Sequence, residues 1–145
     1  MKIKIKKLCE NAVLPTYGSA GAAGADLYAC LNQEELSIGK GETVLVRTGV
    51  QMAIPEGYVG LVYARSGLAS KRGLAPANKV GVIDSDYRGE ILVALFNQSG
   101  ETQTIKNGER IAQIVIAPYL KADFEESDCL EETERGEGGF GSTGR

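Results

Sequence analysis

The chain contains no histidine among its 145 residues. This absence excludes nucleophile systems of the Ser-His-Asp or Cys-His kind. It also excludes zinc sites with imidazole ligands, including the zinc deaminase pattern. Any acid–base chemistry must therefore come from Asp, Glu, Lys, Tyr or Cys side chains.

Cysteine and long apolar stretches are also scarce. The three cysteines, Cys9, Cys30 and Cys129, are odd in number and far apart, which argues against a disulfide framework and against a zinc knuckle. The longest uninterrupted apolar run, Ile91–Phe96, is far too short to span a bilayer, and the charged N-terminus has no apolar signal region after it. We therefore expect reduced cysteines and a cytoplasmic protein that is not bound to a membrane.

Charge is distributed unevenly along a chain whose length fits one domain. Residues 121–145 hold eight of the 19 acidic side chains but only three of the 16 basic ones. No block of Lys and Arg with interleaved aromatic residues occurs, so a nucleic-acid polymer is not an expected partner.

Short segments rich in Val, Ile, Leu and Tyr are typical of strands, and turn residues such as Pro55-Glu-Gly57 and Asn107-Gly108 separate them. A short helix is expected to begin near Ser66. Strands at this close spacing predict an all-β fold, either a barrel or a jelly roll. The predicted strands cover residues 2–6, 43–48, 50–54, 58–64, 90–97 and 110–119.

The composition changes after residue 121, so we divide the chain into a β domain, 1–121, and an acidic linker with a glycine-rich tail, 122–145. Composition alone predicts a flexible, disordered tail. The tail contains the spacing Gly136-x-Gly138-x-x-Gly141, but no helix can follow it, which rules out a dinucleotide-binding turn. Glycine backbone, hydroxyls and Arg135 could instead contact phosphate oxygens, and Phe140 could stack on a base.

Three further clusters could carry chemistry. Arg65-Ser-Gly67 follows a predicted strand and forms either an anion site or a simple turn. Gly81-Val-Ile-Asp84-Ser-Asp-Tyr87-Arg-Gly-Glu90 predicts a β-hairpin, but it carries more ionisable groups than a turn needs, and Asp84 at the strand end suits a water-activating base. Asp26, which follows small residues, is either a turn residue or a partner of Mg²⁺.

Together these segments resemble the trimeric dUTP pyrophosphatase (dUTPase) family. Five motifs match in order and cover almost the whole chain: Ala23–Leu27, Arg65–Leu68, Gly81–Ile91, Gly108–Gln113 and Arg135–Gly144. The resemblance implies a jelly-roll-like β-barrel, a homotrimer with shared active sites, and hydrolysis of dUTP to dUMP and pyrophosphate with Mg²⁺.

The resemblance also implies residue roles. Asp84 is expected to activate the attacking water, Asp26 to contact the metal through water, and Tyr87 to pack on deoxyribose. The remaining positions divide by the part of the substrate they contact. The triphosphate contacts are Arg65, Ser66, Gly67 and Gln113. The uracil contacts are Asn78, Gly81, Val82, Ile83 and Leu92. The tail that closes over the base and the γ-phosphate supplies Arg135, Phe140, Gly141, Ser142 and Thr143.

Two residues depart from the family pattern: Ala64 stands where proline is usual, and Arg72 where many members have histidine. Neither carries chemistry, but both bear on the details of their loop. One rival is a dCTP deaminase, which shares the fold but generally lacks the last motif. The other is a trimeric binding protein without turnover, which could lose Asp84; the intact Asp84 argues against it.

Overall fold

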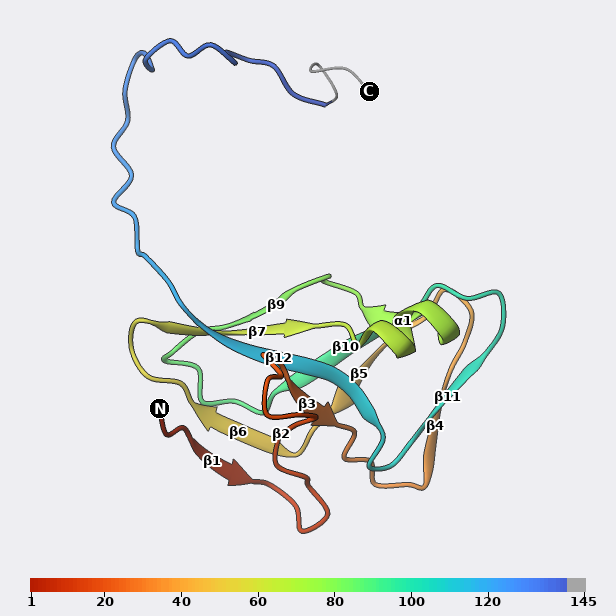
Figure 1. Ribbon diagram of the computed structural model, residues 1–145. Coiled ribbons are helices and arrows are strands. Elements are labelled where there is room, and N and C mark those ends of the chain that lie inside the picture. Colours follow the sequence, from red (N-terminus) through yellow and green to blue (C-terminus); the bar gives the residue numbers. More distant parts are fainter. Residues whose placement is uncertain (141–145) are drawn as a thin grey trace.

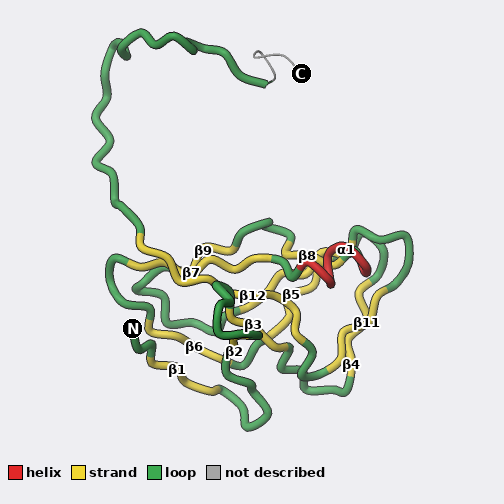
Figure 2. The backbone as a smooth tube through the Cα atoms, viewed as in Figure 1, coloured by secondary structure: helices red, strands yellow, loops and turns green. Residues whose placement is uncertain are grey.

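The computed structural model describes residues 1–140 and is built almost entirely of strands, with one short helix (Figures 1 and 2). The helix α1 spans Ser66–Arg72. The strands are β1 Lys4–Lys7, β2 Thr16–Tyr17, β3 Ala25–Tyr28, β4 Glu35–Ile38, β5 Thr43–Arg47, β6 Val50–Ala53, β7 Tyr58–Tyr63, β8 Leu74–Pro76, β9 Gly81–Ile83, β10 Leu92–Asn97, β11 Gln103–Lys106 and β12 Arg110–Pro118.

These strands form four separate sheets. The largest has the order β2-β3-β12-β7-β9, and the others are β5-β10-β8, β11-β4 and β1-β6. The strand pairings within residues 1–140 are all antiparallel, and β12 is the longest of these strands, paired with β3 on one side and β7 on the other. The all-β prediction is confirmed, although the ladders within residues 1–140 do not close into a barrel.

Alternation of apolar and polar residues explains which face of each strand is buried. Along β10, Val93, Leu95 and Asn97 are buried while their neighbours are not, as expected for a period of two. Asn97 is a polar residue in this core, and its side-chain amide donates to the carbonyls of Ile38 and Glu101 at 2.9 and 2.8 Å. Its burial is therefore compensated by hydrogen bonds.

Cys9 and Cys30 lie beside each other, with sulfur atoms 2.50 Å apart, which the prediction of separate reduced cysteines did not anticipate. Their Cα atoms are 8.0 Å apart, farther than the roughly 4.4–6.8 Å that a disulfide bond spans. Gly49 packs against both sulfur atoms, and its φ of +68° favours glycine. Cys9 belongs to the N-terminal segment and Cys30 to the segment that follows β3, so these two segments lie side by side here.

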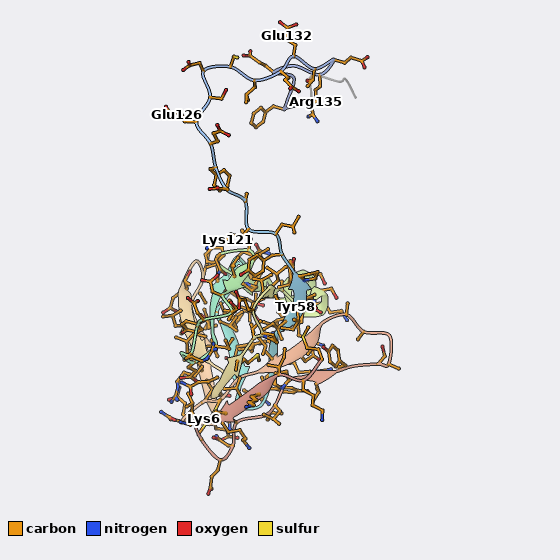
Figure 3. All side chains as sticks on the ribbon, turned by 90° about the vertical axis from the view of Figure 1, so that its left-hand side faces the viewer. Lys6, Tyr58, Lys121, Glu126, Glu132 and Arg135 are labelled. Atoms are coloured by element: carbon orange, nitrogen blue, oxygen red, sulfur yellow. A yellow bond between two sulfur atoms is a disulfide. The ribbon has the colours of Figure 1, made fainter. Side chains whose placement is uncertain are left out.

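After β12 the chain leaves the body as an extended segment. Lys121 lies at this exit, and Glu126, Glu132 and Arg135 lie on the segment beyond it, all away from the body (Figure 3). Residues 120–140 contain no helix or strand, and their apolar side chains Leu120, Phe124 and Leu130 are exposed. Within residues 1–140 the single helix has seven residues, too few to cross a bilayer.

Candidate active site

Asp26 lies on β3, where small residues allow close packing. It is only 8% exposed. Gln113 of β12 is its register partner, and Gln113 also pairs with Tyr63 of β7, so the three residues form one row across the sheet. A side chain at Gly24 would clash with the Gln113 side-chain oxygen, which explains the glycine before this strand.

Two arginines bind the Asp26 carboxylate from different sides. The Arg65 Nε atom donates to Oδ1 at 2.6 Å, and Arg110 Nη1 donates to Oδ2 at 3.2 Å. Each guanidinium group keeps further N–H donors that Asp26 does not use, because arginine has five. The group therefore presents two oriented positive charges, which suits a bound anion. The resemblance gave no role to Arg110, although it lies inside the fourth motif.

The segment Arg65–Gly67 begins at the end of β7 and opens α1. Arg65 has extended backbone angles, and its carbonyl accepts the first helical bond from Ala69 at 2.9 Å. Gln113 Nε2 donates to the carbonyl of Ala64 at 2.8 Å, which ties this segment to β12. Because proline also has a carbonyl at this position, Ala64 preserves the contact that the family residue would make.

The predicted uracil contacts gather around a second, smaller feature. A cavity of about 90 Å³ is lined by five of these predicted residues, together with residues of β7, β8 and β10. A side chain at Gly81 would come within 3.2 Å of Val62 and 3.4 Å of Asn78 Nδ2, so the backbone here lies close to its neighbours. The five predicted residues are Asn78, Gly81, Val82, Ile83 and Leu92.

The predicted hairpin around Asp84 is wrong in its pairing. β9 pairs with β7, whereas β10 pairs with β5 and β8, so residues 84–91 form a loop between two sheets. β10 pairs with β5 over five residues, which is more than the three residues of β9 could offer it. Asp84 remains the first residue after β9, exposed, and lines a cavity of about 960 Å³ with Arg88, Lys2 and Lys4.

The 84–91 loop is held by a residue that the sequence did not single out. Glu90 accepts hydrogen bonds from Arg47 Nε at 3.0 Å and from the Gly49 backbone N–H at 2.8 Å. The Tyr87 hydroxyl donates to the Glu90 carbonyl at 3.0 Å, and a side chain at Gly89 would clash with the Tyr87 ring. In the sequence, Glu90 is one of several charged residues in this loop. Its position after Arg88-Gly89 therefore indicated only weakly that it holds the loop.

Asp26, Arg65, Arg110 and Gln113 (the Asp26 group) lie far from residues 84–91 (the Asp84 loop) within one chain. The register along β7 shows the separation. Asp84 follows Ile83, which pairs with Gly60 near the start of β7, whereas Asp26 lies level with Tyr63 at the end of β7. Three strand spacings and about four residues along the strand separate them, which corresponds to roughly 20 Å. The structure thus brings the predicted triphosphate contacts together and the predicted uracil contacts together, but it does not bring the two groups to one place.

The tail residues lie apart from both groups. Arg135 donates from Nε to the carbonyl of Gly138 at 2.8 Å, and Phe140 is fully exposed. The other predicted tail contacts, Gly141, Ser142 and Thr143, lie outside the described residues.

The residues present fit a metal ion that arrives with a substrate. Residues 1–140 contain no group of three or more His, Cys, Asp or Glu side chains that could hold one. Asp26 keeps free lone pairs beside its two arginine partners, because a carboxylate has about four acceptor positions. Mg²⁺ commonly takes one or two carboxylates, substrate phosphates and water. The single carboxylate of Asp26 is therefore sufficient for a Mg²⁺ ion whose other ligands are substrate phosphates and water.

These features define an all-β protein that has arginine side chains suited to a bound anion at one place and a small cavity at another. The family model for dUTPase matches residues 10–144. The deoxyuridine 5'-triphosphate nucleotidohydrolase of Desulfitobacterium hafniense is 54% identical, with 99% of this chain and 97% of the relative covered. That of Hydrogenobaculum sp. is 49% identical, with 99% of each covered.

Solved structures agree. A variant of the Staphylococcus bacteriophage 80alpha dUTPase with dUpNHpp has a TM-score of 0.90 and 30% identity, covering 99% of each chain. A dUTPase variant from phage phi11 of S. aureus, described with a structural Mg(II) ion, has a TM-score of 0.81 and 26% identity, covering 91% of this chain and 100% of that one. The chain belongs to the dUTPase family.

Proposed function

We propose that this protein hydrolyses dUTP to dUMP and pyrophosphate with Mg²⁺, and thereby lowers dUTP and supplies dUMP. The observation that carries the proposal is the small cavity beside β9, lined by the five predicted uracil contacts, with Asp84 directly at the strand end. Backbone groups along β9 can pair with the polar edge of uracil, and close walls leave no room for the methyl group of thymine.

The triphosphate would bind at the Asp26 group. Arg65 and Gln113 supply donors there, with Ser66 and Gly67 exposed at the start of α1. Guanidinium groups recognise phosphate through paired N–H donors. Asp26 would hold Mg²⁺ through water, and the ion would supply charge stabilisation on the phosphate oxygens.

Asp84 would accept the proton of the attacking water. The water would add to the α-phosphorus, the bond from this atom to the oxygen that bridges the α- and β-phosphates would break, and pyrophosphate would leave. A general base must lie within hydrogen-bond reach of that water. Tyr87 would pack on deoxyribose, and the tail residues Arg135 and Phe140, with Gly141, Ser142 and Thr143, would close over the substrate and exclude water.

The separation of roughly 20 Å within one chain supports sites that are shared between chains. Asp84 of one chain cannot act on a phosphate bound by Asp26 of the same chain without a large rearrangement. Assembly of several copies would bring the Asp84 loop of one chain to the Asp26 group of another. The 121–140 segment, which extends away from its own body, suits contact with a neighbour (Figure 3). We therefore propose the homotrimer that the resemblance implies.

Pyrophosphate release from dUTP, dTTP, dCTP and UTP, measured with and without Mg²⁺, tests the reaction. We expect rapid release from dUTP alone, and only with the metal. Ammonia release from dCTP is the control for a deaminase. Binding of dUTP without any pyrophosphate release would indicate a binding protein.

Mixing two inactive variants tests the shared site. In a three-fold ring, each trimer that mixes Asp84→Asn chains with chains lacking residues 135–145 contains one site with both parts intact. Random one-to-one mixing should restore about one quarter of all sites. Mixed trimers that are present by native mass but hydrolyse no dUTP would show that loop and tail come from the same chain.

A further inference from the structure

Arg72, the last residue of α1, makes three side-chain contacts with β11 and with the turn that follows β11. Its Nε donates to Gln103 Oε1 at 3.3 Å, Nη1 forms an ion pair with Glu109 Oε1, and Nη2 donates to the carbonyl of Thr104. The side chains of Arg72 and Glu109 are 32% and 26% exposed, so the ion pair is partly shielded from solvent. We refer to this set of contacts as the Arg72 clamp.

The acceptor side of the clamp is itself fixed. Glu109 Oε2 accepts from the Lys106 backbone N–H at 2.9 Å, which closes the turn between β11 and β12. Gly108 in this turn has a φ of +76°, a conformation that favours glycine. Glu109 immediately precedes β12, the strand that carries Arg110 and Gln113. The clamp therefore connects α1 to the strand that supplies the other triphosphate contacts.

The helix depends on such contacts for its orientation. A helix of seven residues is not stable by itself in water. Only Leu68 is buried among its residues, and Gly73 ends it in the left-handed conformation. Arg72 is its second attachment, and α1 lies at the same end of the body as β4 and β11 (Figures 1 and 2). Because the helix is about 10 Å long, a tilt at Arg72 displaces Arg65 and Ser66 at the other end.

We propose that Arg72 is a positioning residue for triphosphate binding, and that it holds Arg65–Gly67 in place relative to Gln113 through Glu109 and the turn between β11 and β12. This rests on the proposed function, and it explains the departure from the family pattern. Arginine offers a planar fork that reaches three acceptors at once, and it stays charged at every physiological pH. Histidine has two ring nitrogens and loses its charge near pH 6.5, so it cannot make the same set of contacts.

The test compares Arg72→Gln with Lys71→Gln. Lys71 lies in the same helical turn and carries the same charge, but it makes no side-chain hydrogen bond within residues 1–140. Calorimetry would measure binding of α,β-imido-dUTP with Mg²⁺ and, separately, of dUMP. In Arg72→Gln we expect roughly tenfold weaker binding of the triphosphate analogue, comparable to one charge-assisted hydrogen bond, and unchanged binding of dUMP. Lys71→Gln should change neither.

Three further measurements separate positioning from general stability. Glu109→Gln should reproduce the effect of Arg72→Gln, and Arg72→Lys should recover part of it. Amide hydrogen exchange over residues 65–72, without any ligand, should accelerate in Arg72→Gln but not in Lys71→Gln. If Arg72→Gln weakened binding of the triphosphate analogue and of dUMP equally, or weakened neither, the proposed role of Arg72 would be overturned. Failure of the wild-type protein to bind the analogue would instead overturn the proposed function, while the exchange result would still decide whether the clamp orders the helix.

Discussion

The carboxylates of Asp26 and Asp84 differ in burial and in hydrogen bonding. Asp26 is buried, and both of its oxygens are bound by arginine side chains. Asp84 is exposed and lines an open cavity, and no side-chain hydrogen bond involves it within residues 1–140. Asp26, which orients two arginine side chains, is therefore held rigidly by the fold. Asp84, the proposed general base, is accessible to a water molecule. Substitutions at the two places should have different consequences.

The largest effect is expected at Asp84. Asp84→Asn removes the proposed base without changing size, so kcat should fall at least ~10²-fold while binding of α,β-imido-dUTP persists. Steady-state kinetics and calorimetry together measure both quantities. A near-normal kcat would remove Asp84 from the reaction.

Deleting residues 135–145 should lower kcat/KM by a similar order, ~10²-fold, because closure excludes water and adds contacts to the substrate. The melting temperature without substrate should change by no more than ~1 °C, since the described part of this segment is exposed and contributes little to the core. Scanning calorimetry of the deleted and full chains checks this. A large fall in melting temperature would show that the tail stabilises the body instead.

Stability should distinguish the two carboxylates most clearly. Asp26→Ala leaves Arg65 and Arg110 without their shared partner and should lower the free energy of unfolding by about 2 kcal/mol. Asp84→Ala should change it by less than about 0.5 kcal/mol, as is usual for exposed positions. Urea denaturation of the two variants measures the difference, and equal values would contradict the comparison.

The smallest effect is expected at Tyr87. Its ring would occupy the space of a 2′-hydroxyl group, so Tyr87→Ala should narrow the ratio of kcat/KM for dUTP over UTP, by roughly tenfold if one steric contact is lost. Tyr87→Phe is the matched control, because it keeps the ring and removes only the bond to the Glu90 carbonyl. An unchanged ratio in Tyr87→Ala would leave the tyrosine with a structural role alone.

Periodicity predicted the longer strands well. Residues 58–64 and 110–119 were expected as strands, and β7 and β12 lie within one or two residues of these bounds. The short strands β2, β3, β4, β8 and β11 were missed, because two to four residues carry too little alternation to stand out from loops. The helix at Ser66 was predicted from a turn followed by Leu68, which is the one buried residue of α1.

The sequence by itself determined the family, the all-β fold and the candidate residues, because those depend on local pattern and motif order. Tertiary structure alone decided which of these residues meet. Asp26 pairs with Arg65 and Arg110 because three strands align in register, and no local pattern encodes a contact between positions 84 residues apart. For the same reason the loop after β9 joins two sheets instead of closing a hairpin: β9 pairs with β7, and β10 pairs with β5 and β8, so each pairs with strands that are not its neighbours in the sequence, and no local pattern encodes such pairings.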